Sequence, residues 1–188
     1  AQKAAEQGVD GLILVCAGAG GHAGTLSPFA LVREVKQWFD GTVILSGSIG
    51  DGHSVASAIA LGADFAYLGT RFIATEEANA EPEYKKMLEE SAAQDIVYSS
   101  LFTGVLGNYL KPSIKNAGLD PENLPDADKS SMNFGSGGNT DSKAWKDIWG
   151  SGQGIGGIKD SPSVAELVGR IKSEYEEAYN EFKLKTGN

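Results

Sequence analysis

A histidine surrounded by glycines is the first residue of this sequence whose type and setting suit chemistry. His22 lies in the segment GAGGHAG, residues 18–24, directly after an apolar run. Glycine permits positive φ angles and lets the backbone approach a flat or charged ligand closely, because it has no Cβ. An imidazole with an ordinary pKa of ~6.5 suits proton transfer at neutral pH. Most loop histidines are only solvated or packed, but the four glycines in this segment favour a functional role.

Two further glycine-rich turns offer donors for an anion. SGSIGDG, residues 46–52, leads into a predicted helix, so its backbone N–H groups and the positive end of the helix dipole favour a monoester phosphate. LGTRF, residues 68–72, offers backbone amides and the Thr70 hydroxyl, while Arg71 either adds charge or pairs with a surface carboxylate. Each turn alone is weak evidence. Together, one βα unit apart, they match the phosphate site that barrels build after strands seven and eight.

The elements that must position these turns alternate between strand and helix. Short apolar runs bounded by glycine predict strands over residues 11–16, 42–46 and 65–68, each buried on both faces of a parallel sheet. Apolar spacing predicts helices over residues 28–39 and 51–62 in the two connections. Since the carboxyl ends of parallel strands meet at one edge, the three glycine-rich turns should converge there.

The chain changes character after Phe72. A helix begins at Pro82, and a region rich in glycine, asparagine and proline then extends over about residues 104–157. This composition disfavours strands and predicts short helices and ordered loops that cover another part of the molecule. A capping box of Ser163 and Glu166 begins a last helix whose apolar residues recur at helical spacing, which is typical of a helix docked on a core.

Composition excludes several classes of protein. The 188 residues carry a formal net charge of −9 without a basic run, which argues against nucleic acid and against anionic membrane surfaces. No apolar stretch approaches the ~20 residues that span a bilayer, and the first residues lack a signal-peptide pattern, so we expect a cytoplasmic protein. One cysteine and two histidines are too few for a structural zinc site, and no metal is expected.

Taken together, the motifs resemble the nitronate monooxygenase family, formerly called 2-nitropropane dioxygenases, and the related FMN-dependent enoyl-acyl-carrier-protein reductase. The resemblance covers nearly the whole chain, through GGHAG, SGSIGDG, ALGAD, LGTRF, LKPSI, GLDPENLP, AWKDIW and GSGQG. It implies an α/β fold, namely the C-terminal part of a (β/α)8 TIM barrel with an inserted helical segment. In that family FMN lies across the mouth of the barrel.

On this resemblance the chain divides into three parts. Residues 1–75 would be the last βα units of the FMN-binding barrel, residues 76–162 a helical and loop insert covering the active site, and residues 163–188 a helix packed on the barrel. The three strands would be the sixth to eighth, so five would be missing. An open sheet has unpaired edges and wet apolar faces. We therefore expect the missing N-terminal barrel half, or another copy of the chain, to complete the core.

The resemblance also assigns site residues. His22 corresponds to the active-site histidine of the family. The residues assigned to FMN are Gly20, Gly21, Ser46, Gly47, Ser48, Gly69 and Thr70. Many relatives have two glycines where this chain has Gly47 and Ser48, a change that adds a hydroxyl or shifts the backbone.

Further residues are candidates for the substrate side of the flavin. Trp149 and Gln153 are expected there, because the GQG segment of the family approaches the flavin, and Trp145 and Tyr109 are further candidates. For the tryptophans, packing within a lid is the alternative. Cys16 lies in an apolar run and is interpreted as a buried structural thiol.

The resemblance implies FMN-dependent oxidation of nitronates or nitroalkanes by O2 to a carbonyl compound and nitrite. His22 would remove the α-proton of a nitroalkane or position an ionised nitronate. Two alternatives stay open. One is an FMN-dependent NAD(P)H:quinone or enoyl-acyl-carrier-protein reductase, and the other, from a different class, is a non-redox barrel segment that binds a phosphate ligand.

Overall fold

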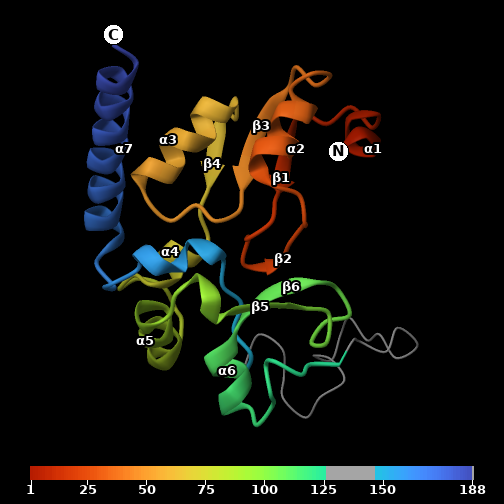
Figure 1. The fold of residues 1–188 in the computed structure, drawn as a ribbon, viewed down its shortest axis with the longest axis vertical. Helices are drawn as coiled ribbons and strands as arrows, with labels where there is room; N and C mark the ends of the chain where they lie inside the picture. The colour runs from red at the N-terminus through yellow and green to blue at the C-terminus, as the bar shows by residue number, and fades with distance from the viewer. Residues whose placement is uncertain (126–146, 188) are drawn as a thin grey trace.

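A three-stranded parallel sheet forms the centre of the first part of the chain (Figure 1). The computed structural model describes residues 1–125 and 147–187. The sheet has the spatial order β1-β3-β4, with strands β1 (Gly11–Val15), β3 (Thr42–Ser46) and β4 (Phe65–Tyr67). Its register pairs Val15 with Ser46 and Ser46 with Tyr67. The predicted parallel βα arrangement is therefore confirmed.

Short helices precede and connect these strands. After α1 (Gln2–Ala5), helix α2 (Pro28–Val35) begins at the predicted proline but ends before the predicted residue 39, and residues 36–38 form a turn. Helix α3 (Gly52–Leu61) has the predicted ends. The carboxylate of Asp51 accepts a hydrogen bond from the Ser54 amide, and Gly62 ends the helix at a φ of 105°.

The described residues cover one face of the parallel sheet. Toward α2 and α3, alternate strand residues join a buried cluster that includes Leu12, Leu14, Val43 and Leu45. On the opposite face the side chains are exposed, at 54% for Ile13, 41% for Val15, 61% for Phe65 and 55% for Tyr67. The prediction that these strands are buried on both faces is thus wrong for the described residues, since both connecting helices lie on the same side of the sheet. Phe29, at helical spacing with the buried residues of α2, is 68% exposed.

The second part of the chain contains a sheet that the composition did not predict. It is antiparallel, has the order β2-β6-β5, and consists of β2 (Gly21–His22), β5 (Ile96–Ser99) and β6 (Gly107–Leu110). The expectation that residues 104–157 lack strands is therefore wrong at β6. Residues of poor strand propensity pair here because every residue of β6 is buried between two partner strands, and tertiary context outweighs intrinsic preference.

The remaining elements surround this second sheet (Figure 1). They are α4 (Thr70–Ile73), α5 (Pro82–Glu90), the 3-10 helix η1 (Ala93–Asp95), α6 (Lys111–Asn116) and the 3-10 helix η3 (Gln153–Gly157). One apolar cluster joins Phe102, Tyr109, Ile114 and Ile148 beside β6. Another joins Leu88 of α5 to Leu110, Ile155 and Ile158. The insert therefore has its own small core.

The last helix, α7 (Val164–Thr186), lies along α3 (Figure 1). Ser163 and Glu166 form the predicted capping box, and Leu167 is buried. A Cβ at Gly52 would come within 2.3 Å of the Ile171 carbonyl oxygen, so glycine is needed where the two helices approach. The apolar face of α7 does not stay packed along its whole length, because Phe182 near its C-terminal end is 61% exposed. Across residues 1–125 and 147–187, no helix combines the length and apolar character needed to cross a bilayer.

Candidate functional site

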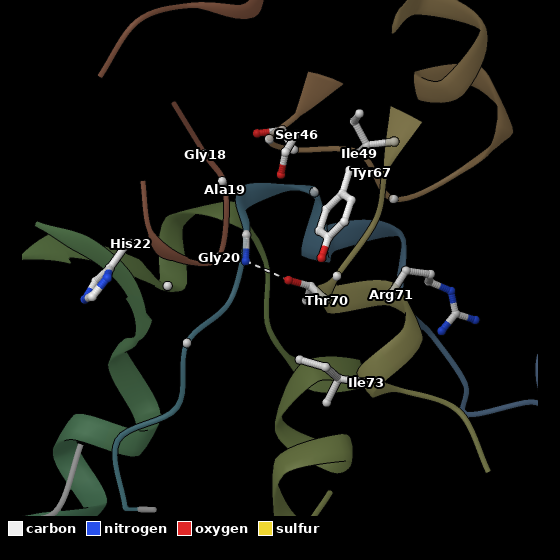
Figure 2. Close-up of a pocket in the computed structure, with 18 of the residues that line it drawn as sticks. Gly18, Ala19, Gly20, His22, Ser46, Ile49, Tyr67, Thr70, Arg71 and Ile73 are labelled. Atoms are coloured by element: carbon white, nitrogen blue, oxygen red, sulfur yellow. Dashed lines mark hydrogen bonds between the residues drawn. The ribbon is translucent and has the colours of Figure 1, made fainter. Parts of the chain in front are cut away.

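The three glycine-rich turns meet at one open cavity of about 390 Å³, beyond the carboxyl ends of the parallel strands (Figure 2). Its lining comes from residues 18–22 after β1, residues 46–50 after β3 and residues 69–71 after β4. Tyr67, at the end of β4, and Tyr84, on α5, also line it. The predicted convergence of strand ends is thus observed, and every residue that the resemblance assigned to FMN lines this cavity.

The turn after β3 has an unusual backbone. Ser48 has a φ of 57°, a left-handed value that glycine adopts without strain and that other residues seldom adopt. Its amide donates to the carbonyl of Gly18 at 3.3 Å. A Cβ on Gly18 would lie 2.0 Å from the Ser48 hydroxyl, so the serine side chain occupies space that glycine leaves open. A glycine at this position would adopt the left-handed geometry without strain.

The N-terminus of α3 is not available to an anion in the way that the sequence suggested. The amides of Gly50 and Asp51 donate to the Ser54 hydroxyl, each at 3.1 Å. The Gly52 amide donates to the carboxylate of Glu174 on α7 at 2.8 Å. Two carboxylates, Asp51 and Glu174, therefore already bind the first turn of this helix. An anion would have to bind the turn that precedes residue 50.

The turn after β4 presents a hydroxyl to the cavity. Thr70 accepts a hydrogen bond from the Gly152 amide at 2.9 Å, which leaves its own proton able to reach an acceptor in the cavity. Gly69 has no heavy atom within 4 Å of an ideal Cβ, so the cavity is open beside it. The site offers neutral donors at this end.

Arg71 belongs to a structural ion pair. Its guanidinium is 3% exposed, donates to the Asp160 carboxylate at 3.0 Å, and points away from Thr70 (Figure 2). Burial lowers the pKa of Arg71 from its usual value. Arg170 of α7 binds both oxygens of the same carboxylate, at 2.9 and 2.8 Å, and holds the pKa of Asp160 below its usual value. Of the two roles considered for Arg71, pairing with a carboxylate is the one observed.

The GSGQG segment, residues 150–154, was expected near the flavin, and its backbone packs on the turns after β1 and β3. The Gln153 amide donates to the Gly18 carbonyl at 2.8 Å. A Cβ on Gly152 would lie 2.8 Å from that same carbonyl oxygen, and one on Gly154 would lie 2.7 Å from the Ser48 carbonyl oxygen. The alternating glycines are the sequence signal for this close backbone approach.

The aromatic candidates of the substrate side pack within the insert. Trp149 stacks on Tyr84 with ring centroids 4.9 Å apart, and it is Tyr84 that lines the cavity. The Tyr84 hydroxyl donates to the Gly150 carbonyl, and burial raises the pKa of this phenol. Gln153 contributes its backbone to the turn, while Tyr109 is fully buried. Trp145 lies outside the described residues.

His22 lies on the wall of the cavity, in β2 (Figure 2). Its Nε2 atom is 2.8 Å from the hydroxyl oxygen of Thr103, on the loop between β5 and β6. The loop before His22 is held by Asn108 of β6, whose buried side-chain amide donates to the Ala19 carbonyl at 2.7 Å. Thr103 and Asn108 were not identified from the sequence.

Cys16 is fully buried, and burial raises the pKa of its thiol to about 11. This supports a structural thiol rather than a nucleophile. Within the part of the chain that the structure describes, no three histidine, cysteine or acidic side chains gather closely enough to hold a metal ion.

The family model "Nitronate monooxygenase" matches residues 1–174. The nitronate monooxygenase of Paraburkholderia phytofirmans is 30% identical to this chain over 190 residues, which cover 94% of the chain and 52% of that protein. The chain thus spans about half the length of the curated relatives that it matches.

Solved structures share the fold. FabK from Thermotoga maritima superimposes with a TM-score of 0.72 at 24% identity, covering 97% of this chain and 59% of its own. A nitroalkane oxidase from Streptomyces ansochromogenes superimposes with a TM-score of 0.70 at 22% identity, covering 96% of this chain and 56% of its own. On the match of the family model to residues 1–174, the chain belongs to the nitronate monooxygenase family.

Proposed function

We propose that this chain supplies the FMN-binding turns and the catalytic histidine of an oxidoreductase. The reaction is the oxidation of nitronates or nitroalkanes by O2 to a carbonyl compound and nitrite. The observation that carries the proposal is the convergence of three glycine-rich turns on one cavity with His22 on its wall. Membership of the nitronate monooxygenase family supports the reaction class.

The residues of the cavity fit FMN. A phosphate monoester requires hydrogen-bond donors, which the hydroxyls of Ser46, Ser48 and Thr70 and the backbone amides of Gly47 and Gly69 can supply. Gly21, next to His22, keeps this part of the wall free of a side chain, as a flat ring system requires, while Gly20 lets the Gly152 backbone approach the turn after β1. When bound, FMN supplies the electron chemistry, and the protein supplies orientation and control of protons.

His22 has a different task for each substrate. For a neutral nitroalkane, an unprotonated imidazole nitrogen accepts the α-proton as the C–H bond breaks, leaving a nitronate and an imidazolium. A nitronate is already ionised, so the ring then only orients the substrate. We propose that Trp149 and Gln153 act on the substrate side indirectly, through the Tyr84 ring and the Gly18 turn that they contact.

The variant His22→Asn tests this role directly. We expect turnover of a nitroalkane to fall by about 100-fold or more, within the usual contribution of a general base. Turnover of the pre-formed nitronate should fall far less. Steady-state assays with both substrates measure the difference, and an unchanged visible spectrum of bound flavin is the control. Equal retention of both activities would contradict the role.

An NAD(P)H-dependent reductase would use the same turns and the same histidine, so it is the second candidate. Anaerobic mixing with NADH or NADPH separates the two, because a reductase bleaches the flavin quickly and a nitronate monooxygenase does not. A flavin-free protein would favour the third reading, a non-redox phosphate-binding segment. A cytoplasmic location stays a prediction from the sequence.

We propose that the whole protein is a (β/α)8 barrel of which this chain is the C-terminal part. Residues 1–75 would be its last βα units, residues 76–162 the insert over the active site, and residues 163–188 a helix packed on the barrel. The uncovered apolar face of the parallel sheet supports this proposal, as does the half-length match to relatives. The missing half would come from further chain or from another copy.

A further inference from the structure

An asparagine of β6 binds the turn that precedes His22. The side-chain amide nitrogen of Asn108 donates a hydrogen bond to the Ala19 carbonyl oxygen at 2.7 Å, although the two residues are 89 positions apart. We propose that Asn108 is a positioning residue. It fixes the peptide group between Ala19 and Gly20, so that the Gly20 amide faces the cavity as a hydrogen-bond donor for the flavin ring. This inference rests on the proposed function, in which the turn after β1 lies against FMN.

The chemistry of the two groups decides which atom of Asn108 faces the turn. A carbonyl oxygen can only accept, so the amide nitrogen of Asn108, and not its amide oxygen, must point at Ala19. Asn108 is 3% exposed, so little water reaches this hydrogen bond to take its place. A buried donor or acceptor that loses its partner is costly. The pair therefore holds the Ala19 carbonyl in one direction.

The direction of the Ala19 carbonyl also sets the direction of the next amide. A peptide group is planar and trans, so its N–H points opposite to its C=O. The Gly20 N–H is therefore turned away from Asn108, and Gly20 lines the cavity while Asn108 does not. No described residue accepts a hydrogen bond from this amide. A Cβ on Gly152 would lie 3.2 Å from the Gly20 nitrogen, so the glycine there keeps the approach to the donor open.

Asn108 is itself held by three neighbouring segments. Its backbone pairs with Gly21 of β2 and with Tyr98 of β5. Its carbonyl oxygen accepts a hydrogen bond from the buried Ser151 amide at 3.2 Å. A residue fixed in this way orients the Gly20 amide before any ligand binds. A donor that is already oriented binds more tightly, because no further ordering is needed on binding.

Asn108→Asp removes the donor but keeps the shape of the side chain. An ionised carboxylate can only accept, so above neutral pH it repels the Ala19 carbonyl oxygen. The affinities for FMN and for riboflavin, which lacks the phosphate, should each fall by about 10-fold, the loss of one oriented hydrogen bond. Their ratio should keep its wild-type value, because Asn108 acts on the ring side of the site. Asn180→Asp is the matched control, since Asn180 is exposed on α7.

Titration of flavin-free protein measures both affinities, and urea unfolding checks that each variant is folded. If Asn108→Asp does not fold, Asn108→Ala removes the donor without adding a charge and should give the same two losses. Unchanged affinities in a folded variant would overturn the inference. A loss confined to FMN would overturn it as well, because Asn108 would then act on the phosphate end of the site.

Amide NMR of the flavin-free protein separates this inference from the proposed function. In the wild type, the side-chain amide protons of Asn108 should exchange slowly with solvent, because they are buried and one of them is hydrogen-bonded. Riboflavin should shift the Gly20 amide signal. A wild-type protein that binds no flavin would defeat the proposed function, and the exchange rate of the Asn108 amide would still test how the turn is held. Fast exchange of these protons would overturn the positioning role alone.

Discussion

At several single positions, the packing around the cavity requires a residue without a side chain. Gly20 is the clearest case, because an ideal Cβ there would lie 2.8 Å from the Gly152 nitrogen and 3.1 Å from the Thr70 hydroxyl oxygen. The backbone of the first turn, the returning insert and the Thr70 hydroxyl therefore meet at this glycine. A shift of the backbone at Gly20 would therefore move both the turn proposed to lie against the flavin ring and the Thr70 hydroxyl proposed to bind the phosphate.

Gly20→Ala should damage both stability and flavin binding. Overpacking against backbone atoms that cannot move independently destabilises a folded protein by about 1–3 kcal/mol. Displacement of the Gly152 segment should also weaken flavin binding by about 10-fold or more, since each 1.4 kcal/mol is tenfold in affinity. Urea unfolding and flavin titration measure the two effects. Gly157→Ala is the control, because open space surrounds that glycine. If Gly20→Ala and Gly157→Ala had the same free energy of unfolding and the same flavin affinity, the close packing at Gly20 would not support the flavin site.

The cavity residues differ in how far the sequence alone could reveal them. His22, Ser46 to Ser48, Gly69 and Thr70 were recognisable because each lies in a short motif directly after an apolar strand. Thr103 and Asn108 were not, since their partners lie 81 and 89 residues away and no local pattern marks such a contact. Only the pairing of β2 with β6 brings these residues together.

At the scale of elements, one ion-pair cluster links three segments around the insert. Asp160, in the loop before α7, binds Arg71 of α4 and Arg170 of α7. Arg71 is the buried member and Asp160 is 46% exposed, so the cluster lies at the boundary between core and solvent. The Asp160 carboxylate mainly stabilises the fold by accepting a hydrogen bond from the buried guanidinium of Arg71.

Asp160→Ala should therefore destabilise the protein more than loss of an ordinary surface charge. Removing the carboxylate partner of a buried charge costs about 1–3 kcal/mol, because the Arg71 guanidinium then keeps only the backbone carbonyls of Ala74 and residue 160 as acceptors. Glu181→Ala is the matched control, since it breaks an exposed pair with Lys185 within α7 and should cost less than about 1 kcal/mol. Urea unfolding of both variants gives the comparison. An Asp160→Ala protein as stable as the control would show that Arg71 finds another partner.

The elements themselves were predictable where local signals dominate. The caps Asp51, Gly62 and Ser163 fixed helix ends correctly, because a capping side chain acts on the amides next to it. Strands β5 and β6 were missed, since their stability comes from pairing with distant segments rather than from their composition. A glycine-rich segment carries the same composition whether it forms a loop or a buried strand.

At the scale of the whole molecule, the parallel sheet has an apolar face that the described residues do not cover. Ile13, Ile44 and Phe65 form one row across its three strands, and Ile13 and Phe65 are 54% and 61% exposed. Exposed apolar rows on a sheet are unusual unless another part of the molecule covers them. A completed barrel would place this row in its interior.

Ile13→Asp and Phe65→Asp test whether the face is covered in the whole protein. A carboxylate placed in a barrel interior should destabilise the protein by about 2 kcal/mol or more, because the charge loses its water. Phe29→Asp is the control, since Phe29 is 68% exposed on α2, on the other side of the sheet. Thermal unfolding of the purified full-length protein compares the three. Three equally small effects would mean that the face is exposed to solvent.

We propose that the turns after β3 and β4 bind the phosphate of FMN, and comparing FMN with riboflavin, which lacks that phosphate, tests this proposal. Titration of flavin-free protein should show FMN bound at least about 100-fold more tightly, because two or more hydrogen bonds to a charged phosphate are each worth about 1.5 kcal/mol. Thr70→Val should narrow this gap, because it removes a hydroxyl donor from the phosphate end of the cavity. Equal affinities for FMN and riboflavin in the wild-type protein would contradict the account.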